Sequence, residues 1–167
     1  MARMGQEITV IDDSDHVGYA ASMVREGEIY MTNVESMVAN VLAALRKHYR
    51  NCAPGRVEYN SMARLNILDH GNKDGIQVGS DWISPSNVTS YEPALKKLRG
   101  RFDKGGFVHL QHCEVGQNRT LLTSLARIFG VSVYAGTSYQ NPVYRFNFGD
   151  YVRADPNGTF TQDVGRP

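Results

Sequence analysis

Strand-like and helix-like segments alternate along this chain of 167 residues, and the alternation limits the folds that it can adopt. Apolar residues recur at helical spacing in three segments, at 34–49, 90–102 and 119–129. Strand-like runs separate them, at 7–13, 27–33, 63–69, 107–113 and 131–135. Because strands that alternate with helices are joined by crossover connections, we predict an α/β fold with a mostly parallel central sheet and helices on both faces, in three α/β/α layers.

Two β elements are predicted outside that alternation. Alternating apolar residues at 76–83 indicate a hairpin-like piece after the strand at 63–69. Aromatic residues alternate through 143–161, and the turn-forming residues at 156–158 predict a small C-terminal β-hairpin extension there. The length fits a single domain, 1–167, with its core at 7–138.

Charge and cysteine content exclude several classes of protein. Lys and Arg number 18 against 17 for Asp and Glu, so no broad basic field is present and no nucleic-acid partner is expected. Cys52 and Cys113 are too few for a disulfide framework or a structural zinc site, and they favour a reducing compartment. No run of apolar residues has the length of a signal peptide or a membrane span. We expect a cytoplasmic protein with no membrane partner, metal or cofactor, although an effector exported by a signal-independent route would share these features.

Two of the predicted strands end in residues that can act together as a catalytic pair. His70-Gly71 follows the strand at 63–69, and Cys113 closes the strand at 107–113. The carboxyl ends of parallel strands open on the same edge of a sheet, where ligands bind. A thiolate is a nucleophile and a nearby histidine generates it, so we identify His70 as candidate base and Cys113 as candidate nucleophile. The N–H groups of Gly71 and Cys113 are candidate oxyanion donors, and a helix beginning at Cys113 would favour the thiolate.

This pattern resembles the caspase/hemoglobinase-fold cysteine peptidases. The segment from Val108 to Gly116 is similar to the Cys-Glu-x-Gly segment of CHAT-type caspase-like domains, and Gln111-His112-Cys113 matches the Gln-x-Cys of caspases. Residues 126–135 look like the helix-to-strand segment that follows the nucleophile in these families. The resemblance covers 63–138 and implies a caspase-like fold. It also implies an endopeptidase that cleaves its substrate through a His70–Cys113 dyad and a thioester acyl-enzyme, with the Gly71 N–H in the oxyanion hole.

The same resemblance implies positions for substrate contacts. Metacaspase-like relatives carry an acidic residue two places before the cysteine, and Gln111 at that place argues against a preference for Arg or Lys. The segment after the last core strand borders the substrate cleft in these families, which makes Tyr139 and Gln140 substrate-binding candidates. Caspases hold an aspartate with arginines, for which Arg64 and Arg145 are the candidates in this chain. The implied partners are a protein or peptide substrate and an activating partner protein.

Other interpretations of these residues stay open. Strand alternation puts His109, Gln111 and Cys113 on one face. Gln111 can line a pocket with His109 hydrogen-bonded below it, both can be satisfied polar residues beneath loops, or His109, Cys113 and His70 can bind a metal. Cys113 alone is also compatible with a buried structural cysteine.

The acidic cluster after the first strand consists of Asp12, Asp13 and Asp15 with His16, and it favours a solvated turn over a metal or acid–base site.

Two other functions are alternatives to the peptidase. One is a catalytically inactive caspase-like interaction or regulatory domain, because a fold does not imply its activity. The other is a small-ligand or nucleotide-binding α/β domain, against which the lack of a Gly-rich phosphate loop argues.

Overall fold

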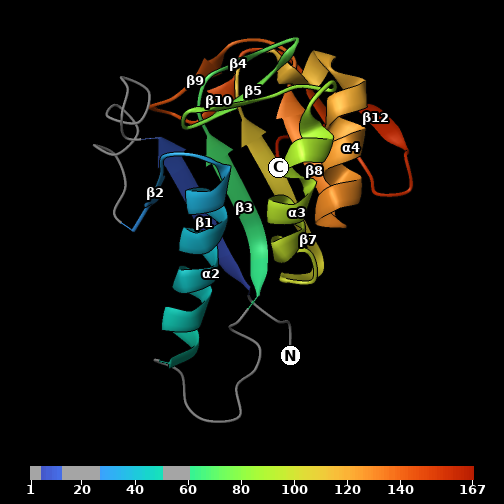
Figure 1. Cartoon of the computed structure of the whole chain (residues 1–167). Coiled ribbons are helices and arrows are strands. Elements are labelled where there is room, and N and C mark those ends of the chain that lie inside the picture. Colours follow the sequence, from blue (N-terminus) through green and yellow to red (C-terminus); the bar gives the residue numbers. More distant parts are fainter. Residues whose placement is uncertain (1–4, 13–26, 51–60) are drawn as a thin grey trace.

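The computed structural model describes residues 5–12, 27–50 and 61–167, and they form a mixed α/β fold around one mainly parallel sheet (Figure 1). Five neighbouring strands run parallel: β2 (Ile29–Met31), β1 (Gln6–Asp12), β3 (Met62–Leu68), β7 (Phe102–Gln111) and β8 (Ser132–Gly136). Two antiparallel strands follow beside β8: β11 (Tyr151–Ala154) and β12 (Phe160–Val164). The strand order β12-β11-β8-β7-β3-β1-β2 places β3 and β7 near the middle of the sheet.

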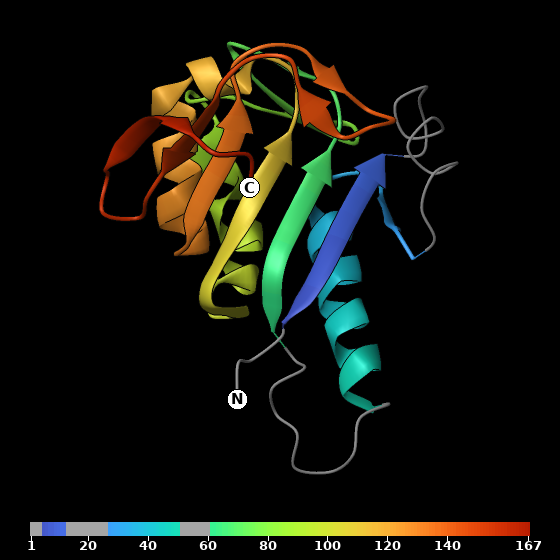
Figure 2. The same ribbon diagram turned by 180° about the vertical axis from the view of Figure 1, so that it is seen from behind.

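The helices of the described residues pack on one face of this sheet. They are α2 (Val34–Arg50), α3 (Val88–Leu95) with the 3-10 turn η2 (Lys96–Leu98), and α4 (Arg119–Phe129). The view from behind shows no helix over the opposite face of β1, β3, β7 and β8 (Figure 2). The prediction of three layers is therefore corrected to two layers in the part of the chain that the structure describes.

The alternation of side chains in the central strands explains this correction. Leu65 and Ile67 of β3 and Val108 and Leu110 of β7 are buried apolar residues, and helical apolar faces cover them. The side chains between them include Arg64, Asn66, His109 and Gln111, which point to the other face of the sheet. These polar and charged side chains interrupt the apolar surface that a helix would cover, although Ile11 and Leu68 form a small buried apolar cluster on this face.

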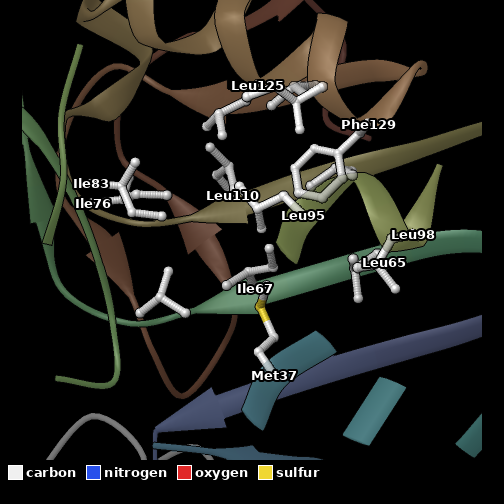
Figure 3. Close-up of a cluster of buried hydrophobic side chains, with 14 of the residues drawn as sticks. Met37, Leu65, Ile67, Ile76, Ile83, Leu95, Leu98, Leu110, Leu125 and Phe129 are labelled. Carbon is white, nitrogen blue, oxygen red and sulfur yellow. The ribbon is translucent and has the colours of Figure 1, made fainter. Parts of the chain in front are cut away.

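The hydrophobic core lies between the sheet and the helices (Figure 3). Met37 of α2 packs from one side of it, Leu125 and Phe129 of α4 from the other, and Leu95 and Leu98 between them. No helix within the described residues is long and apolar enough to cross a membrane.

Two predicted segments have different bounds in the structure, and the predicted C-terminal hairpin has a different place. The helix predicted at 90–102 ends at Leu95 and continues only as η2, because β7 begins already at Phe102 and pairs with Met62 there. An irregularity in that pairing accommodates Gly105, which has a positive φ of 83°. The predicted C-terminal hairpin forms around the turn at 156–158, but its strands β11 and β12 join the edge of the central sheet.

Two small sheets lie beyond the carboxyl ends of the strands. The first is antiparallel and contains β4 (Gly71–Asn72), β5 (Gly75–Val78) and β6 (Asp81–Ile83), in agreement with the predicted hairpin at 76–83. The second pairs β9 (Gln140–Asn141) with β10 (Phe146–Asn147) in the segment between β8 and β11. Both follow parallel strands of the central sheet, and Figure 1 shows them together at its upper edge.

The first prediction concerns the core. Leu110→Ala removes a fully buried side chain from the central strand β7, and we expect it to lower the free energy of unfolding by about 2–5 kcal/mol. The matched change Leu42→Ala, at a half-buried position of α2, should cost less. Urea denaturation of both variants measures the difference, and equal losses would contradict this description of the core.

Candidate active site at the carboxyl edge of the sheet

The pairing of β3 with β7 brings the two candidate catalytic residues to one place. The two strands are adjacent and parallel, and Leu68 lies opposite Gln111. His70 comes two residues after Leu68, and Cys113 comes two residues after Gln111. Both residues therefore leave the sheet at the same edge and at the same height, as the prediction from the strand ends required.

Gly71 lies directly against the loop that follows β7. A Cβ atom built on Gly71 would lie 2.8 Å from Cβ of His112 and 3.3 Å from the carbonyl oxygen of Cys113. No other residue type fits there without displacing one of the chains. In the antiparallel β4–β5 pair, Gly71 lies opposite Ile76, and the hydrogen bond next to them joins the N–H of Gln77 to the carbonyl oxygen of His70. Because hydrogen-bonded and non-hydrogen-bonded pairs alternate, the N–H of Gly71 points away from β5.

The backbone of His70 is held on both sides, while its side chain is exposed. Its N–H donates to Oδ1 of Asp69 at 2.7 Å, and its carbonyl oxygen accepts from the N–H of Gln77 at 2.9 Å. Asp69 is itself buried, and its Oδ2 accepts from the N–H of Gly79 at 2.8 Å. Asp69 and Gln77 were given no role from the sequence, yet they fix the direction in which His70 leaves the sheet.

Cys113 is partly exposed and is contacted by the segment that follows β8. The backbone N–H of Gln140 donates to Sγ of Cys113 at 3.3 Å, so Gln140 lies beside the candidate nucleophile. The side-chain amide of Gln140 is enclosed, with no hydrogen-bond partner for either of its polar atoms among the described residues. Tyr139, the other candidate of this segment, is 65% exposed.

The chain does not enter a helix directly after Cys113. Glu114 adopts a left-handed conformation with φ of 56°, and its N–H donates to the carbonyl oxygen of Ser138 at 2.8 Å. A short 3-10 turn, η3 (Val115–Gln117), follows, and α4 begins only at Arg119. The side chain of Asn118 caps α4 by accepting from the N–H of Leu121. The expectation that a helix N-terminus favours the Cys113 thiolate is therefore wrong.

His109 belongs to a polar network on the helix-free face rather than to the neighbourhood of Cys113. Its Nδ1 lies 2.7 Å from a terminal nitrogen of Arg64 and 3.5 Å from the side-chain nitrogen of Gln111. Since guanidinium only donates, Nδ1 accepts and the ring is neutral. Burial, with the charges of Arg64 and Arg166 as further causes, lowers the pKa of His109 to about 3. Gln111 is buried beside it, which agrees with the prediction that the two side chains share a face.

Both arginines that were candidates for holding an acidic substrate have other partners. Arg64 donates from Nε to Oδ1 of Asn66 at 2.6 Å as well as lying against His109. Arg145 is fully buried and forms an ion pair with the buried carboxylate of Glu28. The proposal of these two arginines as substrate ligands is therefore corrected.

Of the acidic cluster predicted after the first strand, the described residues include only Asp12, which ends β1 at this same edge of the sheet. Asp12 is buried at the end of β1, whereas Asp13, Asp15, His16 and Cys52 lie outside the described residues. The described ranges contain no group of three or more His, Cys, Asp or Glu side chains placed to hold a metal ion. Cavities of about 590 and 360 Å³ lie on the helical side, lined by α2 and α3 and by α3 and α4, and neither includes His70 or Cys113.

Comparison with known families places the chain in one of them. The model of a domain of unknown function, DUF4347, matches residues 21–140, and the chain belongs to this family. The matched region runs as far as β9 and includes His70, Cys113 and Gln140. Among curated proteins, none matches the chain.

Two buried histidines of the β7 segment should make the fold sensitive to acid. Burial lowers the pKa of His112 to about 4, and that of His109 to about 3, against 6.5 in the unfolded chain. The unfolded chain thus binds protons that the folded chain does not, so stability is complete above pH 6.5 and falls as the pH drops toward 4. We expect a loss of roughly 2 kcal/mol per histidine between pH 7 and pH 5.

Urea denaturation at the two pH values measures this loss. The variant His109→Gln removes one of the two titrating groups and should lose less stability over the same interval. Free energies that are the same at pH 7 and pH 5 would contradict the neutral, buried state of both rings.

The close approach of Gly71 gives a further prediction. Gly71→Ala should lower the free energy of unfolding by about 1–3 kcal/mol, because the new methyl group meets His112 Cβ and the Cys113 carbonyl. Gly165→Ala is the matched control, since a Cβ at that glycine has open space around it. A Gly71→Ala variant as stable as the control would show that the two loops do not touch in solution.

Proposed function

We propose that this member of the DUF4347 family is a caspase-like cysteine peptidase that cleaves a peptide bond with a His70–Cys113 dyad. The observation that carries the proposal is the approach of Gly71 to within contact of the Cys113 backbone, which joins the loops after β3 and β7. The mainly parallel sheet, with both residues at its carboxyl edge, supports the caspase-like interpretation of the fold.

The proposed reaction begins at the Cys113 sulfur. His70 takes the thiol proton, and the thiolate attacks the peptide carbonyl carbon to form a tetrahedral intermediate. The intermediate collapses when His70 returns the proton to the leaving amine, and a thioester between Cys113 and the acyl part of the substrate remains. Water, deprotonated by His70, then attacks the thioester, which releases the carboxylic acid and the free thiol.

The oxyanion of the tetrahedral intermediates needs donors that are in place beforehand. The Gly71 N–H points away from β5, and the absence of a side chain on Gly71 lets it approach a substrate at Cys113. The Cys113 N–H is the second proposed donor. Asp69 and Gln77 support this arrangement by fixing the loop that carries both His70 and Gly71.

Gln111 and Gln140 are the proposed substrate contacts. Gln140 lies next to Sγ of Cys113, and Gln111 is the last residue of β7, two positions before Cys113. Buried oxygen atoms of both side chains have no hydrogen-bond partner among the described residues, so each retains an unused acceptor. An amide in place of a carboxylate near the cysteine is consistent with a protein or peptide substrate that is not recognised through Arg or Lys.

One observation favours the alternative of a catalytically inactive interaction domain. The sulfur of Cys113 already accepts the N–H of Gln140, and the Cys113–Glu114 peptide is tied to Ser138 in the same segment. A regulatory module would keep these contacts permanently. In a peptidase, binding of substrate or of an activating partner protein would have to shift the segment after β8.

Thiol reactivity distinguishes the two functions. We expect iodoacetamide to modify Cys113 at pH 6–7 at least about tenfold faster in the unaltered protein than in His70→Ala, because His70 supplies the thiolate. His48→Ala is the matched control: it lies near the end of α2, remote from the carboxyl edge, and should leave the rate unchanged. Mass spectrometry of the labelled peptides separates Cys113 from Cys52, and equal rates in all three proteins would favour the inactive domain.

Peptide turnover provides the second test of the proposed function. In a mixture of peptides of varied sequence, Cys113→Ala should abolish cleavage while thermal unfolding stays cooperative. Cys52→Ala should cleave as the unaltered protein does. Cleavage that persists in Cys113→Ala would show that another group carries the reaction.

A further inference from the structure

His112, the residue before the proposed nucleophile, directly follows the end of β7 and is completely buried. Its Nε2 lies 2.9 Å from the carbonyl oxygen of Gln77 in β5. A carbonyl oxygen only accepts, so Nε2 carries the ring proton. Its Nδ1 is enclosed without a hydrogen-bond partner among the described residues, which leaves the bond to Gln77 as the polar contact that the ring makes.

His112 cannot serve as a second base for the reaction. Burial lowers the pKa of its imidazole to about 4, so the ring is neutral at pH 7. The proton on Nε2 is engaged by Gln77, and the lone pair on Nδ1 is shielded from any substrate. Any effect of His112 on the reaction must therefore come from the position in which its contacts hold the neighbouring residues.

Those contacts join the two proposed catalytic residues. Gln77 accepts from His112 with its carbonyl oxygen, and it donates to the carbonyl oxygen of His70 with its N–H at 2.9 Å. A series of contacts thus links the two proposed catalytic residues: Cys113 is bonded to its neighbour His112, and hydrogen bonds connect His112 to Gln77 and Gln77 to His70. Gly71 completes it from the other side, because its backbone packs directly against Cβ of His112.

We propose that His112 is a positioning residue that sets the distance between His70 and Cys113. This inference rests on the proposed function, since it assigns His112 a role in assembling that dyad. A leucine at this position would fill a similar volume but would leave the Gln77 carbonyl without its donor. A glutamine would carry an N–H at about the same distance from Cβ as Nε2 of histidine, and so would preserve the link.

The test compares His112→Leu, His112→Gln, His70→Ala and the unaltered protein. In each, the rate of Cys113 alkylation is measured from pH 5.5 to 9, together with the midpoint of thermal unfolding. We expect His112→Leu to slow alkylation at pH 6.5 about tenfold, toward the His70→Ala profile, since small displacements of reacting groups have large effects. His112→Gln should stay within about twofold of the unaltered protein. A purely structural role would lower the unfolding midpoint of His112→Leu without changing the pH profile of Cys113.

The outcomes separate this inference from the proposed function. If His70→Ala alkylates like the unaltered protein, the dyad does not exist, and both proposals fall. If His70→Ala is slow while a folded His112→Leu keeps the full rate, the dyad stands and only the positioning role of His112 is overturned.

A measurement on the unaltered protein covers the case in which His112→Leu does not fold. Nitrogen-15 NMR of the histidine rings should show the His112 proton on Nε2, slow to exchange with solvent, and no protonation of that ring between pH 5.5 and 8. A proton on Nδ1, or a ring that titrates near pH 6.5, would mean that the bond to Gln77 is absent, and the inference would fail.

Discussion

The parallel pairing of β3 with β7 is the constraint on which the rest of the molecule depends. Its register puts Leu68 opposite Gln111, so the two loops that follow start level with each other. The same register puts the aliphatic side chains that the helices cover on one face, and the polar side chains, together with Leu68, on the other. A slip of one residue would exchange the two faces and would also separate His70 from Cys113.

Three polar residues near the end of β7 cost stability that apolar residues would not. His109, Gln111 and His112 are all buried, and the two histidines are held neutral against their usual tendency to bind protons. The two histidines have opposite hydrogen-bonding roles: His109 accepts from Arg64 through Nδ1, whereas His112 donates to Gln77 through Nε2. Central strands of parallel sheets are usually apolar throughout, and natural sequences depart from this pattern where a functional site needs polar groups. The position of these residues just before Cys113 fits that principle.

The residues themselves show how far the sequence could be interpreted. His70 and Cys113 were placed at one edge because strand ends in a parallel sheet meet there, and that rule needs no knowledge of side-chain contacts. The polar face that no helix of the described residues covers was also indicated by the sequence, in the alternation of Arg64 and Asn66 with aliphatic neighbours in β3. The roles of Asp69 and Gln77 were not, because they arise from backbone hydrogen bonds between segments that only the fold brings together. Likewise, no local pattern indicates that Glu114 adopts a left-handed conformation and delays α4 to Arg119.

The contacts of the segment after β8 are compatible with both proposed functions, a peptidase and an inactive interaction domain. Gln140 contacts Cys113 at one end of the β9–β10 pair, while Arg145 anchors the connection between those strands to Glu28 through a buried ion pair. An N–H directed at sulfur stabilises a thiolate, yet a donor there also occupies a side from which a substrate carbonyl can approach. Breaking a buried ion pair by removing one charge is costly, so the anchor resists movement of the segment. A substrate therefore reaches Cys113 only if its binding free energy exceeds the cost of moving the segment that the Arg145–Glu28 ion pair holds in place.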